Sequence, residues 1–425
     1  MPAHKHERKI LMYDKFGISN ELIELSKKVE DKIKDIFILI DEIAEYNQGK
    51  VLYSMQKNQL SERHFNPTTG YGYNDDGREI IEKIYAEVFG VEDALVRSNF
   101  VNGTHALNVA LWSVLRPGDK LLAITGKPYD TLDEAIGANG QLGGSLTEFG
   151  VKYEEIELNE NYDIDVEKVV EKIKSEKIKV AMLQRSKGYS VRKTLSSEEI
   201  NNVIRKIKEI DSEVICMVDN CYGEFVEREE PYMADILVGS LIKNPGGGLA
   251  PTGAYIAGKT KYVELAANRL TSPGIGKECG ATLGINRSIL QGFFMAPHIV
   301  AQAVKTAVFC AGMMEELGYE VIPKSNEIRR DIIQLVKLGD KDKLIAFCRG
   351  LQAGSPIDSY VVPTPWAMPG YNDEVIMAAG AFIQGSSIEI SADAPIREPY
   401  VVYMQGGLTY ESGKIAILKA VADLA

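Results

Sequence analysis

Apolar residues recur at helical spacing between residues 19 and 47, with polar residues between them. This pattern predicts one long amphipathic helix, within an N-terminal arm (residues 1–50) that packs on another part of the molecule. A second helix is predicted at residues 77–89, because Asp75 and Asp76 precede it as candidate N-caps and Gly90 is a typical helix end.

From residue 94 onward the pattern becomes strand, loop and helix, repeated. Short apolar runs predict strands at residues 94–97, 120–124, 179–183, 214–218, 236–241 and 254–257. Helical spacing predicts helices at residues 104–115 and 196–210, and Ser196 and Glu199 form a capping box at the start of the second one. This alternation is typical of an α/β fold with a mostly parallel sheet and helices on both faces, so we expect a large domain over residues 51–297.

The pattern changes again after about Pro297. A long helix is predicted at residues 298–317, and a closing helix begins at Tyr410. Between them we predict strands near residues 319–322, 387–390 and 401–404. These elements suit a smaller C-terminal α+β domain over residues 298–425.

Length and composition agree with a two-domain globular protein. The chain has 425 residues, which exceeds the size at which a single hydrophobic core usually stops growing. The net charge of -12 argues against nucleic acid as a partner, because a protein that neutralises phosphates needs a basic face. We therefore expect a small-molecule substrate.

The cysteines and histidines give no sign of a disulfide framework or a metal site. The five cysteines are an odd number without a C-x-x-C pair, and the five histidines show no metal-binding spacing. Residues 1–9 lack the apolar stretch of a signal peptide, and the apolar run at residues 36–40 is too short to cross a bilayer. We expect a cytoplasmic protein with free thiols, no metal and no membrane segment.

Two polar residues follow neighbouring predicted strands. Asp219 comes after the strand at 214–218, at the carboxyl end where open α/β sheets bind ligands, although a turn aspartate is also common there. Lys243 comes after the strand at 236–241 and precedes the loop 244–248. The glycines of this loop let the backbone approach a ligand closely. The alternative is a solvent-exposed lysine, which is more common beside a glycine turn. Together the two residues meet the needs of pyridoxal 5′-phosphate (PLP), which requires a lysine for its imine and a carboxylate to keep its ring nitrogen protonated.

Two further features fit the same cofactor. Residues 98–105 join a strand to a helix N-terminus, where free N–H groups favour an anion, although an ordinary capped helix start explains the same residues. Tyr129 follows the next strand, where it either stacks on a pyridine ring or lies at the rim. The order and spacing of all four features favour a PLP site.

This combination resembles fold type I PLP enzymes, specifically the Cys/Met-metabolism family that includes cystathionine lyases and methionine γ-lyase. The resemblance covers residues 50–425 and is closest to the bacterial branch named for methionine γ-lyase or for aluminium resistance. Three segments carry this closer likeness, at residues 69–73, 243–248 and 272–278. The resemblance implies a large domain with a mostly parallel sheet, a smaller C-terminal domain, and cleavage of a carbon–sulfur bond.

The resemblance also implies roles for single residues. Lys243 is expected to carry PLP as a Schiff base, Asp219 to pair with the pyridine nitrogen, and Tyr129 to stack on the ring and take part in catalysis. Phosphate binding is assigned to Gly103, Thr104 and Ser240. Ser186 falls where the family has a polar residue near the phenolic oxygen of the cofactor.

The family's subunit contact is only partly matched. Tyr71 and Tyr73 stand where the lyases have a Tyr-x-Arg pair that reaches the phosphate of a neighbouring subunit, and the nearest arginine here is Arg78. We accordingly expect a homodimer or homotetramer. Arg397 lies about where the family binds the α-carboxylate of the substrate, a task that suits a bidentate guanidinium; a surface pair with Glu398 is the alternative.

One residue of the sequence bears on which sulfur-containing amino acid is the preferred substrate. Thr131 stands two residues after Tyr129, where methionine γ-lyases commonly have a cysteine. We therefore expect cystathionine-type or cysteine-type substrates to be preferred to methionine, with release of a thiol, ammonia and a 2-oxo acid. Lys243 must lose its proton to act as the base, so its pKa is expected to be lowered by burial and by the cofactor.

Two alternatives remain open at this point. The same cofactor residues serve other PLP-dependent reactions, such as retro-aldol cleavage and racemisation. A non-catalytic, stress-related PLP-binding protein is the other possibility.

Overall fold

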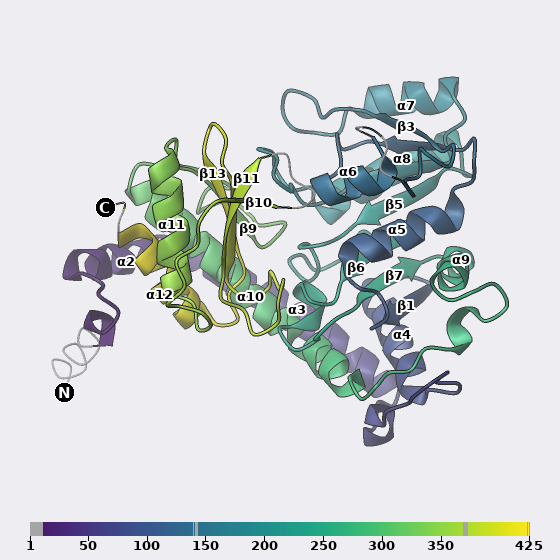
Figure 1. Ribbon diagram of the computed structural model, residues 1–425. Coiled ribbons are helices and arrows are strands. Elements are labelled where there is room, and N and C mark those ends of the chain that lie inside the picture. The colour runs from purple at the N-terminus through teal and green to yellow at the C-terminus, as the bar shows by residue number, and fades with distance from the viewer. Residues whose placement is uncertain (1–11, 139, 141–142, 369–372, 423, 425) are drawn as a thin grey trace. The chain divides into compact units, whose positions relative to one another are not determined.

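The computed structural model describes residues 12–138, 140, 143–368, 373–422 and 424 (Figure 1). Contacts divide the chain into two units. One unit comprises residues 46–296, and the other combines the described residues before 46 with those from 297 onward. The expected division at residues 1–50, 51–297 and 298–425 differs from this one, because the N-terminal segment does not stand apart from the C-terminal part of the chain.

Residues 20–57 form two helices, where a single one is predicted at residues 19–47. Helix α2 (Asn20–Lys32) begins at the N-cap Ser19, and helix α3 (Lys34–Lys57) follows after a break at Ile33. Ile33 is the C-cap of α2 and is almost fully buried. The apolar spacing continues through this buried residue, which is why the pattern did not show the break.

The reason that this segment joins the C-terminal part is side-chain packing. Gly312 belongs to helix α10 (Asn286–Glu316), and a Cβ built on it would lie 2.6 Å from Cγ1 of Val29. The ring of Phe37 meets the ring of Tyr410 edge to face, with 5.1 Å between their centroids. These contacts hold helix α2 and the first half of helix α3 within the smaller unit.

A seven-stranded sheet forms the centre of the unit at residues 46–296. The strands are β1 (Asp93–Arg97), β2 (Lys120–Ala123), β3 (Lys152–Glu155), β4 (Val180–Gln184), β5 (Ile215–Asp219), β6 (Ile236–Ser240) and β7 (Ala254–Gly258). Their order is β1-β7-β6-β5-β4-β2-β3. The pairs from β3 to β6 are parallel, and β7 is antiparallel to both β6 and β1, so six strands point one way. The predicted mostly parallel sheet is confirmed.

The helices of this unit are α4 (Asp76–Phe89), α5 (Gly103–Val114), α6 (Asp130–Ile136), α7 (Val166–Ser175), α8 (Ser197–Ile210) and α9 (Thr260–Leu270), with short 3₁₀ turns η1 (Glu62–Phe65), η2 (Asn244–Gly246) and η3 (Gly276–Glu278). Asp75 caps α4 and Gly90 ends it in the left-handed conformation, as predicted. The capping box of Ser196 and Glu199 is present at the start of α8.

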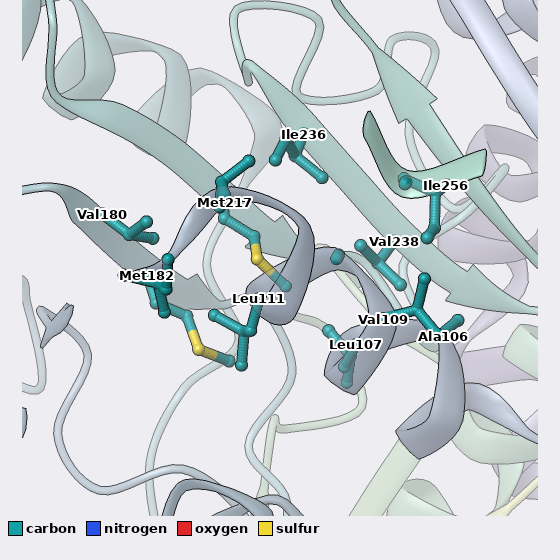
Figure 2. Packing of buried hydrophobic residues seen from close by; sticks show 14 of the residues in the cluster. Ala106, Leu107, Val109, Leu111, Val180, Met182, Met217, Ile236, Val238 and Ile256 are labelled. Carbon is teal, nitrogen blue, oxygen red and sulfur yellow. The ribbon is translucent and has the colours of Figure 1, made fainter. Parts of the chain in front are cut away.

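One apolar cluster fixes α5 against the sheet. Figure 2 shows Leu107 and Leu111 of α5 beside side chains of β5, β6 and β7, among them Met217, Val238 and Ile256. Tyr255, next to Ile256 in β7, instead meets the rings of α4, because neighbouring residues of a strand point to opposite faces. Helices therefore cover both faces, as predicted.

The same alternation determines to which face of the sheet the last side chains of β5 and β6 point. Residues 215 and 217 of β5, and 236 and 238 of β6, belong to the cluster that faces α5. Asp219 and Ser240 are two positions further along and end their strands, so they point to the same face. Both polar residues thus lie at the carboxyl edge of the sheet, on the side of α5.

The smaller unit contains an antiparallel sheet of six strands. Its order is β10-β11-β12-β13-β9-β8, formed by β8 (Glu320–Ile322), β9 (Ile333–Lys337), β10 (Trp366–Ala367), β11 (Glu374–Ala379), β12 (Ser391–Pro395) and β13 (Val401–Gln405). Helices α10, α11 (Lys341–Ala353) and α12 (Tyr410–Ala422) complete the described elements.

Two predictions for this region are wrong in detail. The strand expected at 387–390 begins only at Ser391, because Glu389 accepts hydrogen bonds from the N–H groups of Phe382 and Ile383 (2.8 and 2.9 Å) and holds a loop there. The helix expected from residue 298 begins at Asn286 and passes through Pro297. Buried side chains on both sides of the proline offset the hydrogen bond that it removes.

Helix α10 is the one helix in the described ranges that is long and apolar enough to cross a membrane. However, 72% of its most apolar window is buried inside the protein. A mostly buried core helix passes the same test, so this feature is weak evidence for a membrane segment.

We predict that Leu111→Ala lowers the free energy of unfolding by about 2–5 kcal/mol, because Leu111 is fully buried in the cluster of Figure 2. Leu265→Ala is the matched control, since Leu265 lies on helix α9 with 38% of its surface exposed. Thermal or denaturant unfolding of both variants makes the comparison. Equal losses would contradict the assigned core.

Candidate active site

Lys243 lies directly before the turn η2, three residues after the end of β6. Its Nζ is 4.0 Å from the ring centroid of Tyr222, a cation–π contact. Tyr222 has a φ of 74°, a left-handed conformation that is uncommon for a residue other than glycine. The turn after β5 thus brings an aromatic ring to the lysine, and sequence reasoning did not identify this residue.

Asp219 is buried at the end of β5, and its Oδ1 accepts a hydrogen bond from the N–H of Cys221 (3.1 Å). Burial raises the pKa of Asp219, and the positive charge of Lys243 opposes this effect without cancelling it. A buried carboxylate in this state is stabilised by any further cation. A protonated ring nitrogen is such a cation, so Asp219 fits its predicted role.

The start of α5 and the end of β6 form a small polar cradle. A Cβ built on Gly103 would lie 3.3 Å from Cβ of Ser240, so only a residue without a side chain fits there at ease. The hydroxyl of Ser240 is buried and has no hydrogen-bond partner within the described residues. The first turn of a helix also leaves N–H groups unbonded. A phosphate group would satisfy both needs.

Three hydroxyl groups form a chain beside this cradle. Tyr129 OH lies 2.8 Å from Oγ1 of Thr104, which lies 3.3 Å from Oγ1 of Thr131. The N–H of Tyr129 donates to Oε1 of Gln184 (2.9 Å), which fixes the start of α6. Burial raises the pKa of Tyr129, so its hydroxyl keeps its proton at neutral pH. The contact between Thr131 and Thr104 was not predicted.

Ser186 follows β4, the strand that pairs with β5. It is buried, and its carbonyl oxygen accepts hydrogen bonds from the side chains of Gln184 and Arg192. The structure therefore places Ser186 two residues beyond the strand end that is paired with Asp219. This position is the same edge of the sheet as the rest of the site.

The loop with Tyr71 and Tyr73 presents both rings to the surface of the chain. Their exposed fractions are 71% and 54%, and the rings stack with 5.3 Å between centroids. Arg78 does not take the place of the family's clamp arginine. It is buried, and its guanidinium donates to the carbonyl oxygens of Gly72 (2.6 Å), Gly280 (2.9 Å) and Glu278 (3.0 Å). Arg78 thus fixes the loop from inside.

Arg397 belongs to the smaller unit and is half exposed. Its Nη1 donates to Oδ2 of Asp373 at 2.9 Å, so its partner is not the neighbouring Glu398 that was considered as the alternative. This bond uses one of the five N–H groups of the guanidinium fork.

The charge of Lys243 differs from the expectation. Burial lowers its pKa, but the nearby Cys221, Tyr222 and Asp219 raise it by more, and the net pKa lies well above the ordinary value. The predicted lowering is therefore wrong for the chain by itself, because its own acidic and phenolic groups favour the cation.

Taken together, the fold and this edge of the sheet define an α/β protein with a lysine, a carboxylate and an anion cradle at adjoining strand ends. The family model described as methionine gamma-lyase matches residues 22–425. The chain belongs to this family, and the predicted resemblance and fold class are confirmed.

Relatives of known sequence and structure cover nearly the whole chain. The uncharacterised protein YnbB of Bacillus subtilis is 51% identical over 416 residues, which are 97% of this chain and 99% of YnbB. A solved carbon–sulfur lyase involved in aluminium resistance from Clostridium novyi is 48% identical, covers 99% of both chains and has a TM-score of 0.95. A Clostridium acetobutylicum protein, provisionally named cystathionine β-lyase involved in aluminium resistance, is 49% identical over 98% of this chain and 99% of its own, with a TM-score of 0.94.

We predict that Arg78→Lys lowers the free energy of unfolding by about 1.5–3 kcal/mol, because an ammonium group cannot reproduce the three hydrogen bonds of the buried fork. The variant should also be cut faster by proteases near residues 69–73. Arg63→Lys is the control, since Arg63 is 71% exposed. An unchanged cutting rate in Arg78→Lys would show that Arg78 does not fix the loop.

Proposed function

We propose that this chain is a PLP-dependent carbon–sulfur lyase that acts on a sulfur-containing amino acid. The observation that carries the proposal is the shared direction of Asp219 and Ser240 at adjoining strand ends, next to Lys243 and the start of α5. Family membership and the named Clostridium novyi lyase support the same reaction class.

Different residues would bind different parts of the cofactor. Ser240, Gly103 and the first turn of α5 would hold the phosphate, with Thr104 beside them. Asp219, held by the N–H of Cys221, would keep the pyridine nitrogen protonated. When bound, PLP stabilises negative charge at the Cα atom of an attached amino acid.

Side chains of the protein would carry out the proton transfers of the reaction. The amine of Lys243 would take the proton from Cα of the substrate, and the bond between Cβ and sulfur would then break. Tyr129 keeps its hydroxyl proton and would donate a hydrogen bond in the site. The sulfur would leave with the electron pair of that bond and take up a proton to become the thiol, and one water molecule would hydrolyse the remaining imine to ammonia and a 2-oxo acid. Arg397 would pair with the substrate's α-carboxylate through the N–H groups that Asp373 does not occupy.

The substrate preference is inferred from Thr131. A hydroxyl at this position extends the Thr104–Tyr129 chain, and no thiol is supplied there. Elimination at Cβ needs one proton to leave Cα, whereas elimination at Cγ needs a second proton to leave Cβ. We therefore propose cystathionine-type or cysteine-type substrates in preference to methionine.

The assembly and location are also proposals. The exposed, stacked rings of Tyr71 and Tyr73 are suited to reach a neighbouring subunit's phosphate site, in a homodimer or homotetramer. We propose that the protein works in the cytoplasm on a small amino acid, with neither nucleic acid nor membrane as a partner.

We predict that Lys243→Ala abolishes covalent attachment of PLP, measured by borohydride reduction and peptide mass spectrometry of the purified protein. Lys259→Ala is the matched control, because Lys259 is paired with Asp235 away from the strand ends that form the site. It should bind PLP like the parent chain. Reduced cofactor on a lysine other than 243 would sink the assignment.

For the substrate preference, steady-state kinetics with L-cystathionine, L-cysteine and L-methionine on one preparation are decisive, with pyruvate and 2-oxobutyrate followed separately. We expect kcat/KM for the better of the first two substrates to exceed that for methionine about tenfold, which is a difference of about 1.4 kcal/mol in transition-state stabilisation. A preference for methionine would show that Thr131 is no handicap. Turnover without thiol release would instead favour a racemase or aldolase.

A further inference from the structure

A set of buried polar side chains lies behind the site, on the opposite face of the sheet. Gly239 precedes Ser240 in β6 and therefore faces the other way. A Cβ built on Gly239 would lie 2.4 Å from Oε1 of Glu224 and 2.5 Å from the hydroxyl of Tyr255. We call this set the buried polar layer. It consists of the buried Arg185, Asn220, Glu224, Glu230 and Tyr255, together with Glu227, whose side chain is 13% exposed.

Hydrogen bonds run through the buried polar layer from Arg185 toward Glu224. Arg185 Nη1 donates to Oδ1 of Asn220 (2.7 Å), and Asn220 Nδ2 lies 3.3 Å from the oxygen of Tyr255. The hydroxyl of Tyr255 donates to Oε1 of Glu224 (2.9 Å). The other carboxyl oxygen of Glu224, Oε2, is buried and has no partner among the described residues.

The charges in this layer do not balance if every carboxyl group is ionised. Arg185 is the only cation among the six side chains, and it already contacts both Glu227 (2.6 Å) and Glu230 (3.1 Å). Within the described ranges, Glu224 has no ion pair of its own. A carboxylate that is fully buried with one oxygen unbonded costs much more free energy than a neutral carboxylic acid in the same place.

The pKa of Glu224 agrees with the excess of carboxyl groups over cations in this layer. Burial, followed by the negative charge of Glu230, raises the pKa of Glu224 to about 8. The hydrogen bond from Tyr255 and the charge of Lys243 lower it by less. Cys221, Arg185 and Tyr85 also interact electrostatically with Glu224.

Glu224 is also tied to the segment that carries the lysine. Asn244, which follows Lys243, donates from its buried Nδ2 to the carbonyl oxygen of Glu224 (2.9 Å). Tyr222, two residues before Glu224, holds its ring under the lysine nitrogen. One short turn therefore connects Asp219, the ring below Lys243 and the buried acid.

We infer that Glu224 holds a proton as a neutral acid behind Lys243 and is a positioning residue, whose ionisation favours the protonated form of the lysine nitrogen. The first half of this inference concerns the chain alone. The second half rests on the proposed function, because it concerns the nitrogen that would carry PLP. Neutral Glu224 leaves Lys243 easier to deprotonate at neutral pH than an ionised Glu224 would.

The first measurement is infrared spectroscopy of the full chain without cofactor, from about pH 6 to about pH 10. We expect a carbonyl band of a protonated carboxylic acid that fades near pH 8, the pKa of Glu224. The component that fades near pH 8 should be absent in Glu224→Gln and retained in Glu227→Gln, a change in the same layer; comparing the variants separates it from bands of other buried carboxyl groups such as Asp219. A parent chain without this component, or the same component in Glu224→Gln, overturns the inference.

The second measurement is a pH titration of the visible absorption band of the cofactor-loaded protein. Glu224→Gln should shift its midpoint down by about one pH unit relative to the parent chain, because the amide never becomes negative. Equal midpoints would refute the action on Lys243 while the infrared band still reports on Glu224. A chain that takes up no PLP would defeat the proposed function and leave the infrared result standing. A Glu224→Gln chain that does not fold also counts against the inference, since the amide accepts the same hydrogen bond from Tyr255.

Discussion

The alternation of side chains along β5 and β6 is the constraint on which the site depends. Each strand buries apolar residues at every second position against α5, and this register leaves Asp219 and Ser240 pointing to the same side where the strands end. A shift of one residue in either strand would turn its polar end to the opposite face and its apolar residues to the wrong side. The apolar core and the placement of the chemistry are therefore fixed by one register.

At the carboxyl edge of the sheet, the two faces carry different sets of charged and polar groups. On the α5 side lie Lys243, Asp219 and the hydroxyl of Ser240, which has no hydrogen-bond partner in the part of the chain that the structure describes. On the other side, Arg185 donates hydrogen bonds to the side-chain oxygens of Asn220, Glu230 and Glu227. The glycine at position 239 lets the second set approach the strand, so the polar groups on both sides lie close to the same few backbone atoms.

The sequence was most informative where local chemistry determines structure. Caps such as Asp75 and the Ser196–Glu199 box, and the apolar strands β1, β2 and β4 to β7, depend on neighbours in the chain and were predicted to within a residue or two. The strands β3, β9, β10 and β11 were not predicted. The break at Ile33, the passage of α10 through Pro297 and the loop held by Glu389 depend on tertiary packing, which periodicity does not reveal. The same limit applies to Tyr222 and Glu224, whose importance arises from a turn that brings them to a lysine distant in sequence.

Arg78 has a consequence for how two copies of the chain would meet. Its three hydrogen bonds to backbone carbonyl oxygens set the shape of the Tyr71–Tyr73 loop using contacts within one chain. A loop that is already ordered loses little conformational entropy when another surface closes on it. Association through these rings would therefore be a docking of preformed surfaces, in which mutation of the buried arginine weakens binding without removing any atom from the interface.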